Sequence, residues 1–81
     1  MTEKEIFDKL VGIIGPHAKN TEMLAKVGNG TSILKDLGVN SSRLVDVIIA
    51  MEDQFGIEIT DEDAEKVGTM GDAVTIIKSK L

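Results

Sequence analysis

Two adjacent serines, Ser41 and Ser42, are the side chains of this 81-residue sequence best placed to do chemistry. They follow a glycine-containing segment, residues 36–40, and stand at the start of a long stretch of helical periodicity. The first N–H groups of a helix are unpaired and its dipole is positive there, so this position favours an anion. A serine here can carry a phosphate group. The ordinary alternative is that it only caps the helix.

Other candidates for chemistry fail on their surroundings. His17 is the only histidine and stands beside Pro16, so it has no histidine partner for a metal. The acidic run at residues 61–65 lacks the glycine and the closing glutamate of a calcium loop. Gly28-Asn29-Gly30 lacks the flanking strand and helix that a phosphate-binding loop needs. We therefore expect no metal site, and the absence of cysteine excludes thiol chemistry by the chain itself.

Charge and composition narrow the function further. The net charge is -5, which disfavours nucleic acid and favours a basic protein surface as partner. One histidine and no tyrosine leave few general acids or bases near neutral pH, so we expect a protein that is not an enzyme. Uncharged stretches are far shorter than the roughly 20 apolar residues that span a bilayer, and the N-terminus lacks a signal pattern. We expect no membrane span and a cytoplasmic location.

Helical periodicity defines the elements that must position the serines. Apolar residues recur at offsets of three and four, and glycine or proline separates the periodic segments. Asn40, Ser41 and Ser42 are all suited to cap the central helix. The predicted elements are a helix over 2–14, a long first loop over 16–40 in which 21–26 could form a turn of helix, a helix over 41–55, an extended link over 57–59, a short helix ending near 67 and a helix over 69–81.

These elements predict an all-α fold, a small antiparallel bundle of three longer helices and one short helix. Its length leaves room for one domain, covering residues 1–81.

The sequence around Ser41 resembles the acyl carrier proteins. D-L-G-V-N-S-S at residues 36–42 is similar to that family's D-L-G-x-D-S-L, and the helix that follows ends in the same E-x-x-F pattern. Residues 57–67 resemble the family's I-x-I-x-D-E-x-A-E-K-I, and the order of elements agrees over essentially the whole chain. The resemblance implies that a phosphopantetheinyl transferase attaches 4′-phosphopantetheine from coenzyme A to Ser41. The thiol of that arm would then hold an acyl group as a thioester.

Three positions depart from the family pattern. Asn40 replaces the aspartate before the serine, Ser42 replaces the leucine after it, and Arg43 stands where an acidic or neutral residue is common. The departures indicate either a specialised carrier or impaired modification, and Ser42 remains a rival to Ser41 for attachment. The alternatives are a peptidyl or aminoacyl carrier, and an unmodified helical interaction module that kept the fold.

Acidic side chains of the central helix suggest where partners bind. Asp46, Glu52 and Asp53 surround Ile49, which lies off the apolar stripe. On charge pattern alone this is an ordinary solvated helix face. The resemblance implies a docking surface for basic patches on the transferase and on acyl-loading, synthase or acyltransferase enzymes, with the carrier acting as a monomer.

Overall fold

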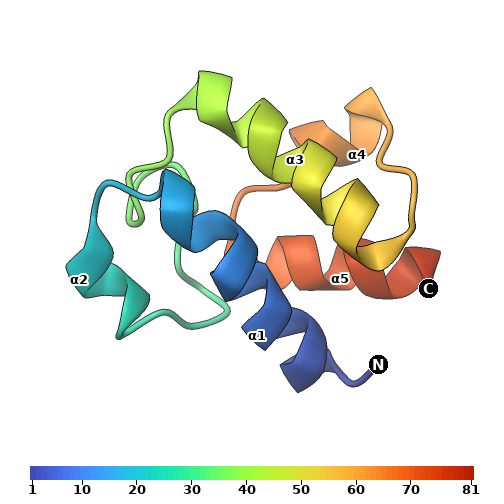
Figure 1. Cartoon of the computed structure of the whole chain (residues 1–81), viewed down its shortest axis with the longest axis horizontal. Coiled ribbons are helices and arrows are strands. Elements are labelled where there is room, and N and C mark those ends of the chain that lie inside the picture. The colour runs from blue at the N-terminus through green and yellow to red at the C-terminus, as the bar shows by residue number, and fades with distance from the viewer.

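The computed structural model describes all 81 residues and contains helices but no strand. The only bridge between extended segments joins Ser32 to Thr69. Figure 1 shows α1 and α3 running in opposite directions, with α5 crossing beside them and the short α4 above α5. The all-α prediction is confirmed. The elements are α1 (Glu3–Ile14), a 3₁₀ turn (Gly15–His17), α2 (Thr21–Leu24), α3 (Ser41–Phe55), α4 (Asp61–Glu65) and α5 (Met70–Lys80).

Helix α1 begins as its sequence predicts. The Thr2 hydroxyl accepts a hydrogen bond from the Glu5 N–H, and the Glu5 carboxylate accepts one from the Thr2 N–H at 2.9 Å. The bond from the Thr2 backbone lowers the pKa of Glu5. Gly15-Pro16 follows residue 14, where we predicted the end of this helix. The α-helix does end at Ile14, but the chain makes one further 3₁₀ turn, because proline is tolerated at the start of a helical turn.

Helix α3 packs its apolar stripe against α1. Val47, Met51 and Phe55 are buried, and Gly56 ends the helix in the left-handed conformation at φ 64°. Lys9 ties the two helices together at this end. Its Nζ donates to the Gln54 carbonyl at 2.7 Å and lies 5.0 Å from the centre of the Phe55 ring. Val47, Met51 and Phe55 belong to one core cluster of 15 buried hydrophobic residues, drawn from every longer helix and from the loops.

The long first loop is more ordered than its sequence indicates. Residues 21–24 form the second short helix, α2, so the bundle has two short helices where we predicted one. Beyond α2 the loop pairs with the end of the connection between α4 and α5 and with the first turn of α5. Ile33 N–H donates to the Gly68 carbonyl, Met70 N–H to the Thr31 carbonyl, and Gly71 N–H to the Asn29 carbonyl at 2.8 Å. This pairing joins segments far apart in the chain, so local sequence patterns do not predict it.

Helix α4 is shorter than predicted, ending at Glu65 rather than near Val67. An ion pair fastens it to the end of α5. Lys80 Nζ lies 2.7 Å from Asp63 Oδ2, which also accepts a hydrogen bond from the Thr60 N–H. The hydrogen bond from Lys80, followed by the one from Thr60, lowers the pKa of Asp63 below its ordinary value.

The lowered pKa predicts how Asp63 contributes to stability. A carboxyl group whose pKa is lower in the folded chain contributes stability above its unfolded pKa, about 3.9 for aspartate. That stability is lost as the pH falls through the folded pKa. We therefore expect Asp63→Asn to unfold more easily than wild type at neutral pH, with a difference that narrows in acid. Denaturant unfolding at about pH 7, 5 and 3 measures it.

The matched control is Asp61→Asn, which removes an exposed carboxylate of the same helix that makes no ion pair. It should change stability less than Asp63→Asn at neutral pH. A difference between wild type and Asp63→Asn that stays constant over the whole pH range would contradict the role assigned to the ion pair.

Candidate functional site

The start of α3 is capped by Asn40, not by a serine. Asn40 Oδ1 accepts the hydrogen bond from the Ser42 N–H at 2.8 Å, and Asn40 has the extended conformation of a helix cap. Ser41 is therefore the first residue of the helix. The side chains of Ser41 and Ser42 are both exposed, and neither hydroxyl takes part in a hydrogen bond. The simple capping role for Ser41 is thus wrong, and its hydroxyl is free to react.

The electrostatics of this helix start fit an anionic substituent on Ser41. The N–H groups of Arg43 and Leu44 both reach the Asn40 carbonyl, at 2.9 and 3.0 Å, whereas the Ser41 N–H has no partner. The first turns of the other α-helices carry acidic side chains, but that of α3 carries none and contains Arg43. The positive end of the α3 dipole is not offset by a carboxylate. A phosphodiester at Ser41 would be stabilised there.

The turn before Ser41 fixes the direction in which the helix start projects. Leu37 and Val39 are almost fully buried on either side of Gly38. Gly38 has φ 69°, and a Cβ at this position would lie 3.2 Å from the Cβ of Lys19. Glycine is needed here both for the backbone conformation and for the close approach of the α2 segment. The two buried anchors therefore leave Asn40 and the serines at the surface.

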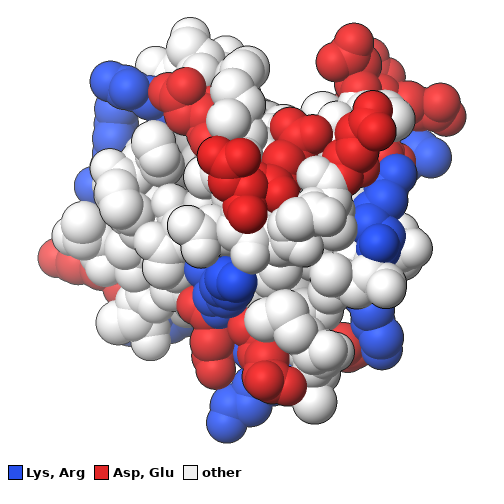
Figure 2. Space-filling model, turned by 45° about the vertical axis from the view of Figure 1, so that its right-hand side comes forward, with Lys and Arg blue, Asp and Glu red and all other residues white.

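Three of the four predicted docking residues lie together on the outer face of α3. Asp46 and Asp53 are exposed, and 52% of the surface of Ile49 is accessible. Val45, one turn before Ile49, is 57% exposed and was missed by sequence reasoning. Its position off the apolar stripe was the signal that could have identified it. Figure 2 shows acidic side chains across the upper part of the face in view, with uncharged surface between them, and further acidic side chains among basic ones near its lower edge.

Glu52, the fourth predicted docking residue, has a structural role. It is only half-exposed, and its Oε2 accepts a hydrogen bond from the Ile59 N–H at 3.0 Å. The carboxylate thus connects α3 to the extended link that leads to α4. Asp46 is also engaged, because Arg43 Nη1 lies 3.5 Å from its Oδ2. Of the three acidic residues, Asp53 alone makes neither a hydrogen bond nor an ion pair through its carboxylate.

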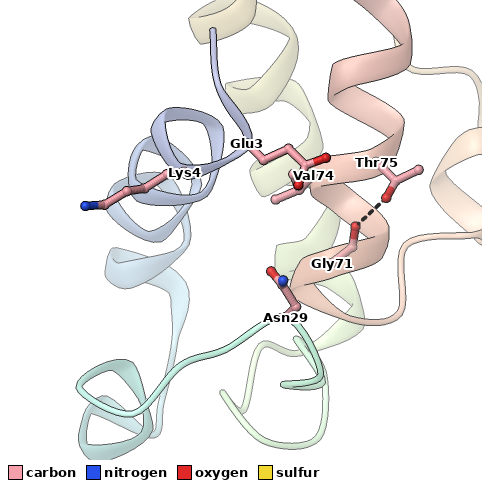
Figure 3. Close-up of a pocket in the computed structure, with 6 residues that line it drawn as sticks. All are labelled: Glu3, Lys4, Asn29, Gly71, Val74 and Thr75. Atoms are coloured by element: carbon pink, nitrogen blue, oxygen red, sulfur yellow. Dashed lines mark hydrogen bonds between the residues drawn. The ribbon is translucent and has the colours of Figure 1, made fainter.

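The one cavity in the structure lies at a different place. It has a volume of about 410 Å³ and opens between the start of α1, Asn29 and the start of α5 (Figure 3). Of the six residues that line it only Val74 is hydrophobic, and none belongs to α3. The hydroxyl of Thr75 on its wall is used within α5, donating to the Gly71 carbonyl at 2.9 Å. This polar, open cavity is unsuited to an apolar chain.

The structure also gives two negative findings. No helix has both the length and the hydrophobicity that crossing a bilayer requires. No group of three or more acidic, histidine or cysteine side chains is arranged to hold a metal ion.

The hydrogen bond of Glu52 predicts that charge reversal at two neighbouring residues, Glu52 and Asp53, changes the free energy of unfolding by different amounts. Glu52→Lys removes the acceptor for a partly buried N–H group, so we expect it to lower the free energy of unfolding by about 1–2 kcal/mol. Asp53→Lys, the matched control one residue later, should change it by less than about 0.5 kcal/mol. Urea unfolding of both variants measures the difference. Equal stability of the two variants would show that the Glu52 bond contributes nothing.

Comparison with known proteins identifies relatives that share this arrangement. The family described as "Phosphopantetheine attachment site" matches residues 19–77, a segment that contains the whole of α3. An acyl carrier protein of Lactobacillus acidophilus is 44% identical over 80 residues, covering 98% of this chain and 96% of that protein.

Two further relatives agree. A mitochondrial acyl carrier protein of Dictyostelium discoideum is 32% identical over 96% of this chain, which spans 62% of the length of that protein. The solved structure of an acyl carrier protein from Enterococcus faecalis matches with a TM-score of 0.82 and 37% identity, and the match covers 100% of both chains.

Proposed function

Because this chain belongs to the acyl carrier protein family, we propose that Ser41 is the residue to which its 4′-phosphopantetheine group is attached. The family carries this group covalently, and the chain acts as a carrier in fatty acid or lipid biosynthesis. The observation that supports Ser41 is the cap of α3. Because Asn40 accepts the hydrogen bond from the Ser42 N–H, the hydroxyl of Ser41 is not needed to cap the helix. The register of D-L-G in residues 36–38 favours Ser41 over Ser42.

The chemistry needed from this chain is small. The Ser41 oxygen forms a bond to the phosphorus of coenzyme A that bears the pantetheine, its proton passes to a base of the transferase, and adenosine 3′,5′-bisphosphate leaves. The chain contributes an accessible hydroxyl at the positive end of α3, where the resulting phosphodiester is stabilised. Once attached, the arm supplies a thiol that holds acyl groups as thioesters.

We further propose that residues 1–81 act as one monomeric domain that catalyses no step itself. Phosphopantetheinyl transferases and synthases are partners of the family in general. For this chain the docking surface we propose consists of Asp46, Ile49 and Asp53, joined by Val45, with Glu52 at its edge. The charge of the chain, -5, supports partners with basic surfaces. A cytoplasmic location stays a prediction of the sequence.

Separate substitution of the two serines tests the attachment residue. We expect Ser41→Ala to abolish loading, because it removes the attacking oxygen, while Ser42→Ala still loads. Intact mass spectrometry after incubation with coenzyme A and a broad-specificity transferase measures the product. Both variants should keep the helical circular dichroism of wild type, because Asn40 provides the cap. Loading of Ser41→Ala but not of Ser42→Ala would place the arm on Ser42, and no loading of wild type would favour the unmodified interaction module.

Charge reversal tests the docking surface. We expect Asp53→Lys to slow association with a transferase or synthase more than Asp46→Lys does, because Arg43 already offsets the charge of Asp46. The effect should appear mainly in the association rate and should shrink at high ionic strength. Asp8→Lys is the matched control, since it makes the same charge change at an exposed position of α1. If all three variants associate at the wild-type rate at low salt, this face of α3 is not the docking surface.

A further inference from the structure

Asn20 makes an unusual set of contacts for an exposed residue. Its Oδ1 caps α2 by accepting from the Met23 N–H at 3.3 Å. Its Nδ2 donates to the Asp36 carbonyl at 3.1 Å, and its backbone N–H donates to the Leu37 carbonyl, also at 3.1 Å. One residue thus binds two consecutive carbonyls of a segment far along the chain. Those carbonyls belong to the turn that leads directly into α3.

Hydrogen bonds within this turn close it on itself. Ser32 N–H donates to the Asp36 carboxylate at 2.8 Å, and Val39 N–H donates to the Ile33 carbonyl at 3.2 Å. The segment over 32–39 is therefore a closed unit, anchored to the core by its buried apolar side chains. On its outer side the contacts come from the start of α2, through the two bonds of Asn20 and the close approach of Lys19 to Gly38.

The position of this unit sets the position of Ser41. Only Gly38, Val39 and Asn40 separate the Leu37 carbonyl, which Asn20 binds, from the serine; Gly38 has a positive φ and Asn40 the extended conformation of a helix cap. A shift of the unit relative to the core is transmitted to the first turn of α3 and hence to the Ser41 hydroxyl. A displacement of about 1 Å of a reacting group can lower a rate substantially even when binding is unchanged.

We propose that Asn20 is a positioning residue for the loading of this protein: its amide group holds the turn that presents the Ser41 hydroxyl to the transferase. The proposal rests on the assignment of Ser41 as the attachment residue. Asn20 acts through the turn and touches neither the serine nor the docking surface on α3. Its loss should therefore lower the turnover number for loading and leave the binding of the transferase unchanged.

Asn20→Asp separates the two roles of the amide. Aspartate caps helices as well as asparagine does, so the bond to the Met23 N–H is kept. The new carboxylate cannot donate to the Asp36 carbonyl and places a second acceptor beside it, so the side-chain bond to the turn is lost, while the backbone N–H of residue 20 can still donate to the Leu37 carbonyl. Asn20→Ser is made in parallel, because serine also caps α2 but its side chain ends one bond short of Nδ2. Asn29→Asp is the control, since it makes the same chemical change at an exposed residue whose side chain makes no hydrogen bond.

The experiment measures steady-state loading of each variant by one transferase with saturating coenzyme A. We expect kcat to fall about three- to tenfold for Asn20→Asp and Asn20→Ser, with KM for the carrier within about twofold of wild type. Asn29→Asp should load like wild type. Amide hydrogen exchange gives a second readout: the Val39 amide should exchange faster in Asn20→Asp, while the Leu10 amide in α1 keeps its wild-type rate.

The outcomes distinguish this inference from the proposed function. Wild-type kcat for both Asn20 variants overturns the positioning role, and so does a rise in KM with kcat unchanged. Equally faster exchange at Val39 and Leu10 also overturns it, because the effect is then a general loss of stability. If wild type itself is not modified, or is modified on Ser42, the assignment of Ser41 fails, and this inference fails with it. A lowered kcat, an unchanged KM and local loosening at Val39 together support the role of Asn20.

Discussion

The hydrogen bond from the Ser42 N–H to Asn40 Oδ1 decides where α3 begins, and the rest of the site depends on that starting point. Successive residues of a helix point in directions about 100° apart, so the apolar repeat at offsets of three and four sets which face of α3 is buried. With the observed start, Val47 and Met51 enter the core and Ile49 faces outward. Because Asn40 makes this bond, neither Ser41 nor Ser42 is needed to cap α3. A single interaction therefore leaves the serine hydroxyls free, beside an exposed surface that the apolar repeat of α3 sets.

The loop before α3 determines where the helix start lies relative to the core, which the cap alone does not do. Leu37 and Val39 are buried, and the chain passes between them through Gly38 with a positive φ. Farther back, residues 29–33 pair with Gly68 before α5 and with the first turn of α5. The reactive end of α3 is thus braced by segments from both halves of the sequence. An exposed hydroxyl on a well-fixed helix start suits a residue that an external enzyme must modify.

Local patterns predicted the parts of this fold that local interactions stabilise. The apolar repeats of α1, α3 and α5 and the caps at Thr2 and Gly56 are properties of neighbouring residues, so they could be predicted from the sequence. The start of α3 was narrowed to three capping residues, and the structure selects Asn40. The second short helix and the bond of Glu52 to Ile59 were not predicted as such. The first is held by a turn far along the chain, and the second depends on how the link after Gly56 folds back.

Two of the three departures from the family pattern, Asn40 and Arg43, share one electrostatic effect. Asparagine caps a helix as well as aspartate does, so Asn40 keeps the helix start while removing a carboxylate from beside Ser41. Arg43 adds a positive charge within the same turn and pairs with Asp46 at 3.5 Å. Both changes make the neighbourhood of Ser41 less acidic, and they leave Asp53 as the free acidic group of the outer face. On the docking surface that we propose, attraction to a basic partner is therefore weighted toward the C-terminal half of α3, away from Ser41, the proposed attachment residue.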